Sequence, residues 1–147
     1  MIRIVVDDRE LSDALRRLRS RAEDLSPFMA DAAELILTVT EEAFDAQRSP
    51  DGTPWPDLAP ATWKRKRTRR KLYESGNLQG SLSADSDAHS ATVGVGATSR
   101  GFAYGIVHQL GSRRVPARPF LPVDESGALT ESVKEELLEL LERYLGE

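Results

Sequence analysis

Two proline-rich segments do the most to limit what this chain can fold into. Residues 49–60 read SPDGTPWPDLAP, with four prolines and a glycine, and residues 113–122 read RRVPARPFLP, with three prolines. Proline fixes φ and lacks the amide proton that helices and sheets need, so neither segment can continue a regular element. We therefore expect two long, ordered loops, stiffened by proline and anchored by apolar side chains such as Trp55 and Phe120.

Apolar residues at helical spacing predict three long amphipathic helices around these loops. The first stripe runs from Leu11 to Leu25, and the second from Phe28 to Phe44, with Ser26 as the N-cap of its helix. The third stripe begins at Leu129, and its helix ends at Gly146. The second helix is the longer and more apolar of the first two, so we expect it to be the main core element.

The remaining segments predict short elements of both kinds. Ile2–Val6 and the alternating pattern of Ala91–Ala97 indicate strands, and Ser83–Ser86 can pair with the latter as a hairpin. Ala61–Lys71 favours a short basic helix with Thr62 as its cap, and Ser75–Leu82 favours one further helical turn. The predicted fold class is α+β, as a single domain over residues 1–147: two long N-terminal helices and a C-terminal helix packed with a small antiparallel sheet.

The composition narrows the classes of function. With 147 residues, 39% of them hydrophobic and 30% charged, the chain has the balance of a globular domain. It has no cysteine, and His89 and His108 make no metal-binding spacing, so we expect no metal and no cofactor. No residues are spaced as a nucleophile with a general base or as a pair of catalytic carboxylates, so we expect that the protein is not an enzyme. No signal peptide and no apolar run of membrane-spanning length is visible, so we expect no membrane contact.

A dense basic run stands out against the net charge of -4. Seven of the eight positions from 64 to 71 are cationic, namely Lys64, Arg65, Lys66, Arg67, Arg69, Arg70 and Lys71. Such charges repel one another, so they must be solvated or face something acidic. Three interpretations stay open: a solvated helix face, a contact with DNA, and a contact with the acidic C-terminal helix of a neighbouring copy. That helix carries Glu131, Glu135, Glu136, Glu139 and Glu142.

Several motifs follow one another in a fixed order between Phe44 and Pro122. They are GTPWPDL at 52–58, Thr62 with Lys64, LYESGNL at 72–78 with Ser81 and Leu82, YGIVHQLG at 104–111, and PARPFLP at 116–122. Together they resemble the phage virion morphogenesis family, the tail-completion proteins of the Mu-like G protein type. The density of the basic run departs from that family's pattern.

The resemblance implies a structural protein without catalytic residues that acts in many copies, in a ring at the end of the tail tube. The expected partners are further copies of itself and tail-tube or neck proteins, and the expected location is the virion tail or neck, after assembly in the bacterial cytoplasm. A loop stiffened by proline loses little entropy on docking, so we expect assembly contacts near the two loops. The candidate residues are Trp55, His108, Gln109, Arg113, Arg114, Arg118 and Phe120. The alternative function is a small nucleic-acid-binding accessory protein that uses residues 64–71.

Overall fold

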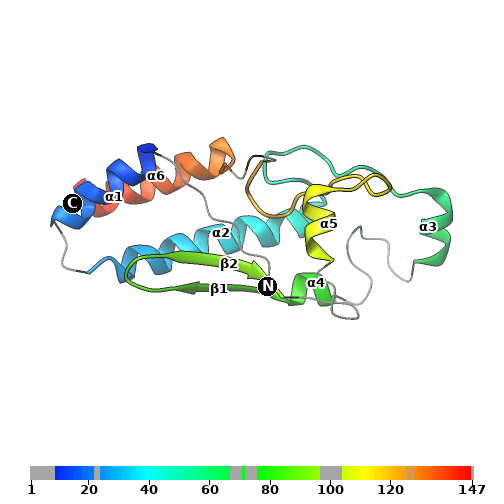
Figure 1. Cartoon of the computed structure of the whole chain (residues 1–147), viewed down its shortest axis with the longest axis horizontal. Helices are drawn as coiled ribbons and strands as arrows, with labels where there is room; N and C mark the ends of the chain where they lie inside the picture. Colours follow the sequence, from blue (N-terminus) through cyan, green and yellow to red (C-terminus); the bar gives the residue numbers. More distant parts are fainter. Residues whose placement is uncertain are drawn as a thin grey trace.

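The computed structural model describes residues 9–21, 24–66, 71, 76–96, 104–124, 126 and 128–146. Within these ranges the chain forms six helices and one two-stranded antiparallel sheet, an α+β fold as predicted (Figure 1). In chain order the elements are α1 (Arg9–Arg21), α2 (Ser26–Ala46), α3 (Pro60–Arg65), α4 (Asn77–Gly80), β1 (Leu82–Ser86), β2 (Ala91–Val95), α5 (Gly105–Leu110) and α6 (Glu131–Gly146).

Helix α2 is the central element. It contacts α6 on one side and both strands of the hairpin on the other, and α6 in turn packs on α1 (Figure 1). Its sequence is apolar around most of its circumference, which is typical of a helix that is covered on more than one face. One helix therefore joins a helical half, formed with α1 and α6, to the hairpin beside it and to the loops beyond its C-terminal end (Figure 1).

The helical half is held by an apolar cluster from three helices. Buried side chains of α1, α2 and α6 make it up, including Ala14, Leu18, Phe28, Met29, Val133, Leu137 and Leu141. The ring of Phe28 meets that of Tyr144 edge to face, with centroids 5.6 Å apart. The Tyr144 hydroxyl also donates to the Asp31 carboxylate, so α6 is fixed to α2 by both apolar and polar contacts.

A second cluster fills the other end of α2. It gathers side chains from α2, the hairpin, α4 and both proline-rich segments: Ala43, Phe44, Trp55, Leu78, Val95, Phe120, Leu121 and Val123. The hairpin lies against it in the register Leu82 to Val95 and Ser86 to Ala91. Its turn is stabilised by the Asp87 carboxylate, which accepts the backbone N–H groups of His89 and Ser90 at 2.7 Å.

The structure corrects several local predictions about where helices begin and end. Ser26 is the first residue of α2 rather than its cap, because the cap position is Leu25, and the Ser26 N–H and hydroxyl both donate to Asp24 Oδ1. Thr62 lies inside α3, whose cap position is Ala59. Leu25 belongs to α2's start and not to α1, which ends at Arg21.

The basic helix is also shorter than predicted. Helix α3 ends at Arg65, and Lys66 is already extended, at φ -72° and ψ 141°. Cations three and four residues apart repel on a helix surface, which disfavours continuing the helix through the basic run. Arg67, Arg69 and Arg70 lie outside the described residues, as does the predicted strand Ile2–Val6. The sequence did not predict α5.

Candidate functional site

The two proline-rich segments lie together and are joined by hydrogen bonds. We call residues 49–60 the first proline loop and residues 113–122 the second proline loop. Arg118 Nε donates to the carbonyl of Pro56 at 2.8 Å, and Arg118 Nη2 donates to the carbonyl of Asp57 at 3.0 Å. In return, the indole N–H of Trp55 donates to the carbonyl of Pro119 at 2.8 Å. The two loops therefore form one connected unit.

Helix α5 holds the second proline loop from inside. The Gln109 Oε1 atom accepts the backbone N–H groups of Phe120 and Leu121, at 3.0 and 2.9 Å, and its Nε2 donates to the Leu121 carbonyl at 3.2 Å. The backbone N–H of Arg118 donates to the His108 carbonyl at 2.7 Å. One buried amide thus supplies partners to backbone groups that proline-rich sequence cannot pair with itself.

The first proline loop is fixed to the C-terminal end of α2. Gln47 ends the helix in the left-handed conformation, at φ 56°, and its carbonyl accepts the Trp55 N–H at 3.1 Å. Its side-chain amide bonds both backbone groups of Lys71, and Lys71 Nζ donates to the Trp55 carbonyl at 3.1 Å. The rings of Trp55 and Phe120 both pack on Phe44, with centroids 5.7 and 5.2 Å away.

Four of the predicted assembly contacts therefore lie inside the molecule. Trp55 is 2% exposed, Gln109 and Arg118 are each 4% exposed, and Phe120 is 0% exposed. Their side chains bind the loops to each other and to the core, so in a single chain they are not exposed for contact with a partner. Of the predicted set, Arg113 and Arg114 are the exposed residues.

His108 differs from the other predicted contacts, which are either buried or exposed. Its side chain is half-buried, its ring meets the ring of Tyr104 edge to face, and its Nδ1 atom is buried without a hydrogen-bond partner. Burial lowers the pKa of His108 below its usual value, and the nearby charge of Arg118 lowers it further. The imidazole is thus held in its neutral form inside the loop unit.

The structure divides the basic run. Lys64 and Arg65 are exposed on α3, and Lys66 is half-buried. The ammonium of Lys71 turns toward the first proline loop, where it bonds the Trp55 carbonyl. Helix α3 is attached to the same loop, because the indole N–H of Trp63 donates to the Asp57 carboxylate at 2.9 Å. The pKa of Asp57 is lowered, first by the hydrogen bond from the Leu58 N–H and then by the bond from the Trp63 indole.

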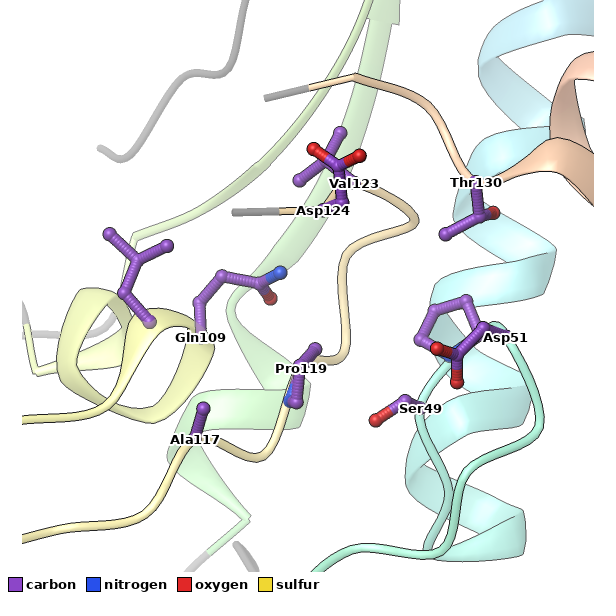
Figure 2. Close-up of a pocket in the computed structure, with 10 residues that line it drawn as sticks. Ser49, Asp51, Gln109, Ala117, Pro119, Val123, Asp124 and Thr130 are labelled. Atoms are coloured by element: carbon purple, nitrogen blue, oxygen red, sulfur yellow. The ribbon is translucent and has the colours of Figure 1, made fainter. Parts of the chain in front are cut away.

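An open cavity of about 220 Å³ lies where the loop unit meets the start of α6. Figure 2 shows Gln109, Ala117 and Pro119 on one side of it, with Ser49 and Asp51 of the first proline loop across from them. The exposed side chain of Leu110 also lines it, and Ile106 stands one helical turn away; they are 53% and 42% exposed. The sequence analysis missed this apolar pair, although its four-residue spacing before Gly111 is a helical signal.

Within the described ranges, no group of three or more histidine, cysteine, aspartate or glutamate side chains is arranged to hold a metal ion. Among the helices described, none combines the length and apolar character of a membrane span.

Comparison with known proteins agrees with the resemblance that the sequence motifs suggested. The model of the phage virion morphogenesis family matches residues 6–146. The chain is also 34% identical, over 122 residues, to the Mu-like prophage FluMu G protein 1 of Haemophilus influenzae, an alignment that covers 78% of this chain and 75% of that protein. No solved structure matches the chain. With most of its length matched, this chain belongs to the phage virion morphogenesis family.

Proposed function

We propose that this virion morphogenesis protein is a non-enzymatic structural part of the tail, which completes the tail or joins it to the neck. In this proposal the protein associates with further copies of itself and docks on tail-tube or neck proteins. Its contact surface is the outer side of the loop unit, with Arg113, Arg114 and the apolar pair Ile106 and Leu110.

One observation carries the proposal: the two proline loops are cross-linked by partly buried hydrogen bonds, while Arg113 and Arg114 of the second loop are exposed. Arg118, Gln109 and Trp55 hold the backbone of both loops from within. A surface that is already rigid loses little conformational entropy when it binds, so more of the contact energy appears as affinity. The exposed apolar pair on α5 adds apolar surface next to the loops, and the buried centre of a protein contact is more apolar than the rest of the surface.

The alternative, a nucleic-acid-binding accessory protein, has less support from the described residues. Lys64 and Arg65 are available on α3, but the Lys71 ammonium is engaged by the first proline loop. Gel shifts distinguish the two functions. Binding that falls steeply with salt and is lost on neutralising Lys64 and Arg65 supports nucleic-acid binding, because each neutralised phosphate adds to the salt dependence.

The proposal is tested by asking whether the protein stays attached to purified tails. A tagged double variant, Arg113→Glu with Arg114→Glu, is supplied to a phage that lacks its own copy, and tails are separated by sedimentation. We expect at least tenfold fewer copies of this variant on tails than of the wild type, because a repulsive charge now occupies the docking surface.

A matched control carries the same change of charge on α1. Arg16→Glu with Arg19→Glu alters two exposed arginines on the far half of the molecule, and the Arg16 pair with Asp13 is itself exposed and worth little. This control is expected to remain on tails at wild-type levels. Equal attachment of both variants, or no attachment of the wild type, would count against the proposal.

A further inference from the structure

The outward face of α6 carries a line of carboxylates. Glu131, Glu135, Glu139 and Glu142 are all exposed, and their spacing places them along one side of the helix, over roughly 16 Å at the usual rise per residue. We call these four residues the acidic stripe. The core residues of α6, such as Val133 and Leu137, lie on a different side, so the packing of the domain does not use the stripe.

None of the four carboxylates of the acidic stripe forms an ion pair with a described residue. Helix α6 meets α1 through an ion pair between Lys134 and Glu10, at 3.2 Å, which does not involve the stripe. Two of the exposed arginines of α1, Arg16 and Arg19, line a separate hollow with Ala88 and His89 of the hairpin turn, and Arg9 lines another with Lys134 of α6. Four like charges on one helix face repel one another, so a cationic partner would relieve an existing cost.

The opposite end of the molecule carries the complementary charge. Lys64 and Arg65 on α3 and Arg113 and Arg114 in the second proline loop are exposed, and none of them forms an ion pair with a described residue. We call these four the basic surface. Asp57 fixes its two parts together, since its carboxylate accepts the Trp63 N–H of α3 and its carbonyl accepts Arg118 of the second proline loop.

The two surfaces are too far apart to meet within one chain. In Figure 1, α6 lies in the half of the molecule that also holds α1, whereas α3 stands at the other end of the long axis. A two-fold contact through either end would oppose like charges. The arrangement suits a head-to-tail contact, in which each copy presents one charge and accepts the other.

We infer that the basic surface of one copy docks on the acidic stripe of the next, so that copies associate head to tail. This rests on the proposed self-association and names the surfaces that meet. A contact between two different surfaces of identical chains closes into a ring when its rotation allows and otherwise grows into a filament. Single exposed ion pairs add little energy, so the charges set orientation and partner choice and make association sensitive to salt.

The test uses two variants with reversed charge. The first carries Arg65→Glu, Arg113→Glu and Arg114→Glu, so that both of its ends are acidic. The second carries Glu135→Lys, Glu139→Lys and Glu142→Lys, so that both of its ends are basic. All six side chains are exposed, and unchanged unfolding midpoints would show that both variants still fold.

Association is followed by light scattering at low salt over a range of concentrations. Each variant alone is expected to be monomeric where the wild type assembles, and an equimolar mixture is expected to recover wild-type assembly, because each end now finds its opposite in the other variant. The Arg16→Glu, Arg19→Glu protein should assemble normally.

Two results would overturn the inference: either variant could assemble like the wild type, or the mixture could stay monomeric. If the first variant assembles normally and also loses salt-dependent binding to DNA, the basic surface is assigned to nucleic acid instead. In each case the wild type still assembles, so the proposed self-association survives. If the wild type stays monomeric and normal tails form in its absence, both the inference and the proposed function are contradicted.

Discussion

Arg118 is a buried charged side chain that joins the two proline loops by hydrogen bonds. Its guanidinium is 4% exposed, and its acceptors are the carbonyls of Pro56 and Asp57. Burial lowers the pKa of Arg118, and the charge of Asp57 opposes that effect. Arginine suits this position because its planar group presents several donors in a fixed arrangement. Neither its burial nor its partners, some sixty residues away, have any local signal in the sequence.

Replacing Arg118 should therefore destabilise the fold more than replacing its exposed neighbour. Arg118→Met keeps much of the aliphatic packing but removes the bonds to two carbonyls, so we expect the free energy of unfolding to fall by about 1.5–3 kcal/mol. The control Arg113→Met should change it by less than about 0.5 kcal/mol. Urea denaturation measures both, and equal effects would show that Arg118 does not join the loops.

His108 gives the loop unit a dependence on pH. Its pKa is lowered in the folded state, so the unfolded chain binds the proton more readily. The resulting stability is complete above the ordinary histidine pKa, near 6.5, and is lost as the pH falls below it. The lowered pKa values of Asp24, Asp57 and Asp87 act in the same direction, but only near and below the ordinary aspartate value of 3.8.

We therefore expect the free energy of unfolding of the wild type to fall between pH 7 and pH 5, and His108→Gln to flatten that slope. Urea denaturation at a series of pH values tests this. If the wild type and His108→Gln show the same slope, His108 does not cause the loss of stability between pH 7 and pH 5.

At the level of elements, the sequence predicts well the helices and strands that carry a periodic pattern of apolar residues. The apolar stripes of α1, α2 and α6 and the alternation in the hairpin are periodic signals from side chains that face a core, and the structure confirms these elements. Helix α5 has six residues, so its periodic signal is limited to one apolar pair, Ile106 and Leu110. Its position depends on Gln109, whose partners Phe120 and Leu121 come later in the chain.

Local chemistry was less reliable where two residues compete for one role. Ser26 before Pro27 has the pattern of an N-cap, but Asp24 binds the Ser26 N–H and hydroxyl, and Ser26 itself starts the helix. The two loops were predictable from their prolines. The sequence did not predict which of their side chains face inward, because burial depends on contacts between loops that are distant in sequence.

Gly111, which lies between the end of α5 and the second proline loop, permits a test at this scale. Its φ is +76°, and a Cβ built there would lie 2.9 Å from the Ala117 N atom and 3.1 Å from the Val115 O atom. Gly52, at φ +93°, has open space around it. Both glycines sit in a conformation that alanine rarely adopts, but only Gly111 is also crowded by backbone.

Gly111→Ala should therefore cost more stability than Gly52→Ala. We expect about 1–3 kcal/mol for backbone strain at either position, with a further loss at Gly111 because the loop must move away from the new methyl group. Thermal unfolding of the two variants measures the difference. Equal losses would mean that the second proline loop yields easily, contrary to a rigid docking surface.

At the scale of the whole molecule, α2 is a central helix with α1 and α6 on one side, the hairpin on the other, and the proline loops beyond its C-terminal end (Figure 1). One apolar cluster lies at each end of α2, so the loop unit is attached to the rest of the fold through packed side chains. The basic surface and the acidic stripe lie on different halves. In the proposed assembly, this packing would hold the two surfaces at a fixed separation in every copy.

The central claim, that this member of the phage virion morphogenesis family is a structural part of the tail, is tested most directly by electron microscopy of particles from a phage that lacks it. The account predicts tails that are incomplete, of abnormal length or not joined to heads, and normal tails when the wild-type protein is supplied. Complete, joined tails of normal length in the absence of the protein would contradict it.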